Sequence, residues 1–217
     1  MSSFLTFVEY IGIIAFAISG ALEGIKKRYD YLGVVILGIV TSTGGGMIRD
    51  LILGITPPYS LRSGINIYLA IVVATIVFIV NLLDDNVNRW TVNKLFDETL
   101  VLSDAMGLAV FVITGMQVAY NISNSYSAIL YIFVGTISGV GGGIIRDMLV
   151  SNTPYIFDGH IYASAAIIGS TAYHLLTYYT GLPVRLVMIS CIILIFVIRM
   201  ISYHFNLNLP RATRIIK

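Results

Sequence analysis

Two short motifs place arginine beside aspartate inside stretches that are otherwise apolar. Arg49-Asp50 and Arg146-Asp147 each begin three residues after a run of three glycines. Charged side chains in such surroundings are costly, and they normally face a charged partner or a water-filled cavity. Adjacent residues on a helix point in different directions, so we expect pairing between the motifs, Arg49 with Asp147 and Arg146 with Asp50. These pairs would either brace the structure or line a pathway.

Two further acids, Glu9 and Asp104, lie at matching positions in apolar stretches. They could attract cations to the two mouths of a pathway, cap helices, or pair with Arg62 or Lys94. The three histidines have no metal-ligand spacing. No Ser-His pair, catalytic aspartate pair or His-Glu-x-x-His motif is present in the sequence. We therefore expect no enzyme and no cofactor, only transported ions.

The elements that must position these charges are membrane-spanning helices. The 217 residues are 57% hydrophobic and 11% charged, whereas soluble domains carry about 25% charged residues. A span needs about 20 mostly apolar residues. Seven segments qualify: residues 4–22, 31–53, 65–83, 99–118, 125–150, 161–182 and 186–205. The sequence predicts an all-α integral membrane protein in a lipid bilayer, and a net charge of +2 does not indicate a nucleic-acid partner.

The basic residues of the loops predict the orientation, because lysine and arginine stay preferentially on the cytoplasmic side. With the N-terminus outside, only Arg62 and Arg185 fall on the outer side. The cytoplasmic side then receives Lys26, Lys27, Arg28, Arg89, Lys94, Arg211, Arg214 and Lys217. We expect a multi-pass protein of the plasma or inner membrane, with its N-terminus outside and its C-terminus in the cytoplasm.

An internal repeat relates the two halves of the chain. The pattern from Glu9 through Gly12 and Phe16 to Gly20 recurs 95 residues later, from Asp104 to Gly115, with every spacing kept. The glycine and Arg-Asp motifs repeat next, and Ile67-Tyr68 matches Ile161-Tyr162. Each repeat holds three spans, an odd number, so the second copy must enter the membrane from the opposite side.

The predicted architecture is therefore two inverted three-helix repeats plus one extra helix. Residues 1–88 form the first repeat, 99–182 the second, and 184–217 the seventh helix with a basic cytoplasmic tail. Inverted repeats meet at a pseudo-two-fold axis in the membrane plane, and their binding or conduction site usually lies near the midplane.

The glycine runs are expected to break or kink the second and fifth helices. Glycine costs about 1 kcal/mol relative to alanine inside a helix and removes packing side chains. The residues concerned are Gly44, Gly45, Gly46, Gly141, Gly142 and Gly143. A break is tolerated at that depth only beside protein or water. The competing interpretation is that small residues simply allow two helices to approach closely.

Oxygen atoms near the breaks are candidate ligands for a hard cation. Backbone carbonyls of residues 40–43 and 137–140 would be freed by a break, and the hydroxyls of Ser42, Thr43 and Ser138 lie close by in sequence. Ser19, in the motif Ser19-Gly20-Ala21, is a further candidate. Together with the glycines, these residues form the predicted ion-binding part of a pore.

The doubled Gly-Gly-Gly-x-x-Arg-Asp motif and Ser19-Gly20-Ala21 resemble the prokaryotic branch of the trimeric intracellular cation (TRIC) channel family, over nearly the whole chain. The resemblance implies a homotrimer with seven helices and one pore per subunit, conducting potassium and sodium. It also implies pore helices kinked at the two glycine runs. Members of the group have also been labelled as glycine transporters.

Two functions are consistent with these features. The first is a passive monovalent cation channel whose pore lies between the first, second, fourth and fifth helices. The second is a secondary transporter of a small amino acid such as glycine, because half-helix N-termini beside Arg49 and Arg146 could bind a carboxylate. The residues alone do not separate them, and the resemblance favours the channel.

Overall fold

The computed structural model describes residues 3–62, 64–83, 94–157 and 161–207, and the regular structure in these ranges is entirely helical. Its helices are α1 (Ser3–Lys26), α2 (Tyr31–Ile52), α3 (Tyr59–Arg62), α4 (Ile65–Leu83), α6 (Lys94–Ile122), α7 (Ala128–Leu149), α8 (Ala163–Tyr179) and α9 (Val184–His204). The all-α prediction is therefore confirmed for the described residues.

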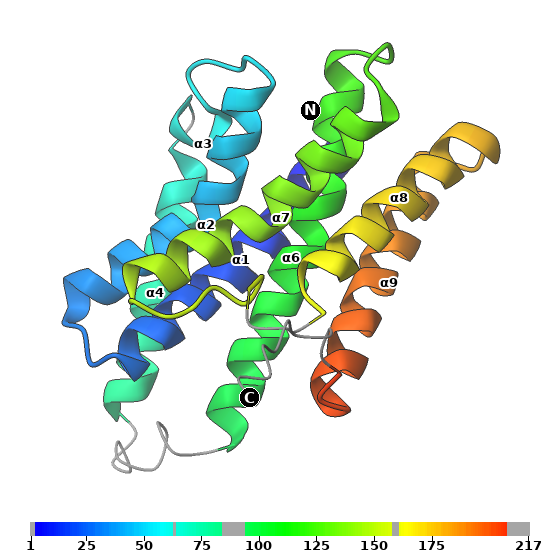
Figure 1. The fold of residues 1–217 in the computed structure, drawn as a ribbon. Coiled ribbons are helices and arrows are strands. Elements are labelled where there is room, and N and C mark those ends of the chain that lie inside the picture. The colour runs from blue at the N-terminus through cyan, green and yellow to red at the C-terminus, as the bar shows by residue number, and fades with distance from the viewer. Residues whose placement is uncertain (1–2, 63, 84–93, 158–160, 208–217) are drawn as a thin grey trace, which may run out of the picture.

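Four helices form the centre of the molecule. α1, α2, α6 and α7 pack on one another, while α4 covers α1 and α2, and α8 covers α6 and α7. In Figure 1, α4 lies at one flank and α8 and α9 at the other. α9 packs on α6 and α8. The two halves therefore use the same packing order, and α9 is an addition to the second half.

Six of the described helices are long and apolar enough to cross a membrane: α1, α2, α4, α6, α7 and α9. The segment predicted as the sixth span, residues 161–182, forms α8, which has 17 residues. At 1.5 Å per residue such a helix is about 26 Å long, less than the roughly 30 Å of a hydrocarbon core. Length and composition thus support six spans directly, and the seven-span count stays a prediction.

The repeat-related residues of the first motif meet each other at the centre. The rings of Phe16 on α1 and Phe111 on α6 stack with centroids 5.5 Å apart and an interplanar angle of 8°. Phe16 lies where a side chain on Gly107 would be. A Cβ on Gly12 would meet Val110 at 2.7 Å and Phe111 at 3.0 Å. The Gly-x-x-x-Phe spacing therefore serves a reciprocal contact, in which each ring fills the space left by the other repeat's glycine.

The caps of α2 and α7 give a direct test of helix energetics. Asp30 accepts a hydrogen bond from the backbone N–H of Gly33 at 2.8 Å, and Ser127 accepts one from Leu130 at 3.3 Å. We expect Asp30→Ala and Ser127→Ala each to lower stability by about 1 kcal/mol, because a helix N-terminus loses its side-chain acceptor. Thermal unfolding in detergent micelles measures this, and Ser125→Ala in the preceding loop is the control. Unchanged melting of both cap variants would contradict the assignment.

Several predictions lie outside the described residues, namely those on Arg89, His160 and the basic tail of residues 208–217. The orientation of the termini and the division into segments 1–88, 99–182 and 184–217 stay predictions.

Candidate functional site

The first half of the chain holds a buried cluster of two acids and one arginine. Arg49 on α2 donates from Nε to Asp50 Oδ1 at 2.8 Å and from Nη1 to Glu9 Oε1 on α1 at 3.1 Å. The second oxygen of Asp50 accepts from the backbone N–H of Tyr59 at 2.8 Å. All three charged side chains are buried. We call Glu9, Arg49 and Asp50 the Glu9 cluster.

The second half repeats this arrangement. Arg146 on α7 donates from Nε to Asp147 Oδ1 at 2.9 Å and from Nη1 to Asp104 Oδ1 on α6 at 2.7 Å. Asp147 also accepts from the backbone N–H of Tyr155 at 3.1 Å. Burial raises the pKa of the Tyr155 phenol, in the loop after α7, to about 12, so that it stays neutral near pH 7. We call Asp104, Arg146 and Asp147 the Asp104 cluster.

The predicted pairing between the motifs, Arg49 with Asp147 and Arg146 with Asp50, is wrong. Each arginine instead pairs with the neighbouring aspartate and with an acid on the preceding long helix of its own repeat. The guanidinium group is a planar fork of five donors, so its Nε can turn back to the adjacent carboxylate while Nη1 reaches another helix. The expectation that adjacent residues on a helix do not pair holds only for side chains that are too short to turn back in this way.

Glu9 and Asp104 lie among the packed helices of the described residues. Both are buried and bind the arginines, and neither pairs with Arg62, which donates to the backbone carbonyls of Pro57 and Thr56. The side chain of Lys94 lies outside the described residues. The structure pairs both acids with arginines other than the expected one. A role of these acids at the two mouths of a pathway stays a prediction.

The predicted helix breaks are absent, because α2 and α7 continue as α-helix through both glycine runs. The glycines instead let the two helices cross in backbone contact. A Cβ on Gly45 would overlap the carbonyl oxygen of Ser138, and one on Gly142 would overlap that of Thr41. The structure therefore favours the packing interpretation of the glycines. We call this contact the glycine crossing.

Reciprocal side-chain contacts surround the glycine crossing. The side chain of Ile145 covers Gly44, and that of Ile48 covers Gly141. These isoleucines occupy equivalent positions in the two repeats. Gly46 is different from its neighbours, because the nearest atom to its hypothetical Cβ is Arg49 Nη2 at 3.7 Å. Close approach therefore does not require the last glycine of the first run, whereas in the second run a Cβ on Gly143 would meet the Tyr162 hydroxyl oxygen at 2.5 Å.

The predicted hydroxyl ligands lie near the glycine crossing, and the predicted carbonyl ligands are not released. Ser42 and Thr43 each donate to the carbonyl of Ile39, at 3.1 and 2.8 Å. Such hydroxyls keep their lone pairs for an ion. The hydroxyls of Ser138 and Thr114 are buried and have no hydrogen-bond partner among the described residues. In continuous helices the carbonyls of residues 40–43 and 137–140 serve helical hydrogen bonds, so coordination by freed carbonyls is not available here.

Three side chains around the Asp104 cluster distinguish it from the Glu9 cluster. Ser19 of α1 accepts a hydrogen bond from Arg146 Nη1, so the cluster reaches across to the first repeat. Arg199 of α9 lies with Nη2 3.9 Å from Asp104 Oδ2, and the Tyr162 hydroxyl lies 3.5 Å from Asp104 Oδ1. Sequence reasoning singled out Ser19, which lies at this cluster, but missed Arg199. An arginine inside an apolar span was the available signal.

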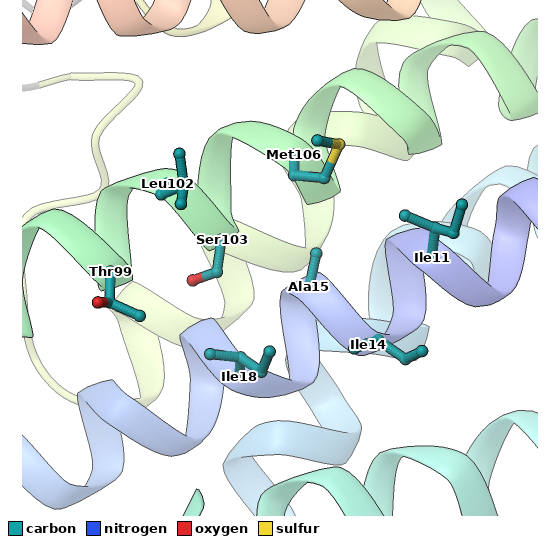
Figure 2. Close-up of a pocket in the computed structure, with 8 residues that line it drawn as sticks. All are labelled: Ile11, Ile14, Ala15, Ile18, Thr99, Leu102, Ser103 and Met106. Atoms are coloured by element: carbon teal, nitrogen blue, oxygen red, sulfur yellow. The ribbon is translucent and has the colours of Figure 1, made fainter.

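An apolar hollow of about 310 Å³ lies between α1 and α6 (Figure 2). The residues around it are Ile11, Ile14, Ala15, Ile18, Thr99, Leu102, Ser103 and Met106. Its two hydroxyls donate to helix carbonyls, Thr99 to Leu95 at 2.8 Å and Ser103 to Leu100 at 3.0 Å. Without a charged side chain, this hollow suits apolar groups, so the candidate ion site is the charged interior and not this hollow.

A family model described as Glycine transporter matches residues 6–82 and 101–178. A solved prokaryotic TRIC channel, determined in 0.5 M KCl, has a TM-score of 0.83 and 34% identity, and the match covers 96% of this chain and all of that one. The chain belongs to the TRIC family. A second TRIC cation channel, with a TM-score of 0.82 and 35% identity, matches over 98% of both chains.

Relatives from bacteria are similar over nearly their full length. The UPF0126 membrane protein YvgT of Bacillus subtilis is 39% identical over 95% of each chain. The UPF0126 inner membrane protein YadS of Escherichia coli is 34% identical over 94% of this chain and 93% of YadS. The TRIC channel orthologue from Rhodobacter sphaeroides has a TM-score of 0.83 at 29% identity. The resemblance to prokaryotic TRIC proteins is thereby confirmed, and this TRIC protein is a multi-pass membrane protein.

Proposed function

We propose that this protein is a passive channel for monovalent cations, potassium and sodium, in the bacterial inner or plasma membrane. One observation carries the proposal: each repeat buries an acid–arginine–acid cluster in the four-helix centre, around a crossing lined by hydroxyls. Ionised groups at membrane depth are expensive and mark ion or substrate pathways. The fold shared with TRIC cation channels supports the same function.

The pore lies within one subunit, between α1, α2, α6 and α7, and is constricted near the glycine crossing. Ser42 and Thr43 on α2 and Ser138 on α7 carry buried hydroxyls next to this helix contact. Hydroxyl oxygens compensate partial dehydration of a cation. Three subunits assemble into a trimer, as in the trimeric TRIC orthologue from Rhodobacter sphaeroides, and lipid surrounds the assembly.

Transport of glycine is the second candidate, and the description of the family model favours it. A transporter of this kind needs a cationic group for the substrate carboxylate. Arg49 and Arg146 each already donate to two carboxylates of the protein. A substrate carboxylate would have to displace one of them. For this reason we place the channel first.

Recording from single molecules in a planar bilayer tests the proposal. We expect discrete unitary currents that reverse at a cation-selective potential under potassium and sodium gradients. Ser138→Ala removes a buried hydroxyl and should lower the unitary potassium conductance by about twofold or more, because dehydration is less well compensated. Ser190→Ala is the matched control, since the Ser190 hydroxyl donates to Val187 within α9.

One result would contradict the channel, and a second would contradict the assignment of Ser138 to the pore. One is the absence of unitary current together with saturable glycine uptake by vesicles containing the same preparation, which would establish the transporter. The other concerns the pore only. If Ser138→Ala and Ser190→Ala have equal unitary conductance, the Ser138 hydroxyl does not line the conduction path.

A further inference from the structure

The two repeats hold equivalent hydroxyls that make different contacts. Ser19 on α1 and Thr114 on α6 occupy the same position of the repeated motif. Ser19 accepts a hydrogen bond from Arg146 of α7, in the opposite repeat. Thr114 is buried, yet its hydroxyl has no hydrogen-bond partner among the described residues. The equivalent donor for Thr114 is Arg49 of α2, so one of two symmetric contacts is made and the other is not.

Arg49 has a donor available for the second contact. Its Nε binds Asp50 and its Nη1 binds Glu9, and within the described part of the chain Nη2 makes no hydrogen bond. Packing beside Nη2 is loose, since it is the atom nearest to a hypothetical Cβ on Gly46 and lies 3.7 Å away. α2 already contacts α6, as α1 contacts α7. Arg49 can therefore turn Nη2 to an acceptor on α6 while it keeps both carboxylates.

The second cluster is more enclosed than the first. The guanidinium carbon of Arg146 lies 5.6 Å from the centroid of the Tyr155 ring, whereas the described residues place no aromatic ring over Arg49 in this way. Tyr162, in the second repeat, is 1% exposed, and its sequence counterpart Tyr68 is 69% exposed. The two halves, alike in the residues of their charged clusters, are therefore held in unlike arrangements.

We propose that Thr114 is a positioning residue for Arg49, which donates a hydrogen bond to it in a second arrangement of the helices. In that arrangement Arg146 leaves Ser19 and keeps its two acids. One buried hydroxyl lacks a partner in either arrangement, so the cost of that hydroxyl does not separate the two in free energy. Halves of an inverted repeat move as rigid bodies against each other, and this exchange is a movement of that kind.

This inference rests on the proposed channel function. Arg49 and Arg146 each follow a glycine run by three residues, so a shift of either arginine moves the helix contact that constricts the pore. The arrangement in the structure, with α2 and α7 in backbone contact at the glycine crossing, is the closed one. Ser19 stabilises the closed arrangement and Thr114 stabilises the open one.

Dwell times in single-channel records test the two hydroxyls separately. Thr114→Val removes the hydroxyl at nearly constant shape and should shorten the open dwell time about fivefold or more, because a hydrogen bond to a charged group is lost. Ser19→Ala should shorten the closed dwell time to a similar extent. Thr114→Ser keeps the hydroxyl and should keep the wild-type dwell times. Thr99→Val is the matched control, since it makes the same change on α6, where the Thr99 hydroxyl donates to the carbonyl of Leu95.

A merely structural Thr114 gives a different result. Replacing a buried hydroxyl that has no partner by a methyl group would then leave the melting temperature unchanged or raise it, with the dwell times of the wild type. Wild-type open dwell times in Thr114→Val, or shortening of the same dwell time by Thr114→Val and Ser19→Ala, overturns this inference alone. If Thr114→Val does not fold, unchanged closed dwell times in Ser19→Ala overturn it. Absence of unitary current in the wild type overturns the channel as well.

Discussion

Alanine at position 45 is expected to destabilise the protein by about 3 kcal/mol or more, because the added Cβ would overlap the Ser138 carbonyl oxygen. Backbone atoms cannot move aside as a side chain can, so α2 and α7 would have to separate. Gly142→Ala should have the same effect through the Thr41 carbonyl. Thermal unfolding of the purified variants in detergent micelles measures the loss.

Gly46→Ala is the matched control, since it lies in the same run and the same helix. Its added Cβ would come no closer than 3.7 Å to Arg49 Nη2. Alanine is preferred to glycine inside a helix by up to about 1 kcal/mol, so Gly46→Ala should be neutral or slightly stabilising. Equal destabilisation at positions 45 and 46 would mean that flexibility of the run matters and not the close contact.

Removal of the Arg49 charge is expected to produce the second large effect. Arg49→Met leaves Glu9 and Asp50 buried without their cation, and breaking a buried ion pair in this way costs about 3–5 kcal/mol. We expect a large fall in melting temperature and in the yield of folded protein. The corresponding change at Arg146 should be as severe, because Asp104 and Asp147 depend on it.

Neutralising the whole Glu9 cluster separates the effect of buried charge on stability from the effect of side-chain packing. The triple variant Glu9→Gln, Arg49→Met and Asp50→Asn carries no charge in this cluster, and the amide introduced by Asp50→Asn keeps an oxygen that can accept from the Tyr59 N–H. Such replacement of buried ion clusters by neutral groups is often close to neutral in stability. We expect most of the lost stability to return while cation conduction stays impaired. A triple variant as unstable as Arg49→Met would show that the arginine acts mainly through packing.

Much of the central architecture could be predicted because the same residue pattern occurs in both halves of the sequence. The matching Gly-x-x-x-Phe spacings identified Gly12, Phe16, Gly107 and Phe111 as related positions, and the structure brings them into one reciprocal contact. Apolar runs of membrane length identified the long helices, because the bilayer imposes their length and composition. Among the segments predicted to span, only α8, with 17 residues, falls short of that length.

The partners of the charged residues could not be predicted in the same way. Arg49 and Arg146 have long side chains with several donors, so that many acids lie within reach and sequence spacing does not select among them. Their partners Glu9 and Asp104 were recognised as special, yet the pairing depended on how α1 packs on α2 and α6 on α7. Local helix geometry says nothing about that packing.

The sequence by itself determined the membrane setting, the repeated halves and the identity of the residues that carry charge inside them. These follow from composition and from the order of residues. The bilayer requires apolar helices of a set length, and the spacing of residues fixes their positions on each helix. The tertiary structure decided that the glycines make a close crossing instead of a break, that each arginine serves its own repeat, and that Arg199 of α9 joins one cluster only. These outcomes depend on contacts between distant segments, and the balance of packing and buried charge that selects them exists only once the helices have assembled.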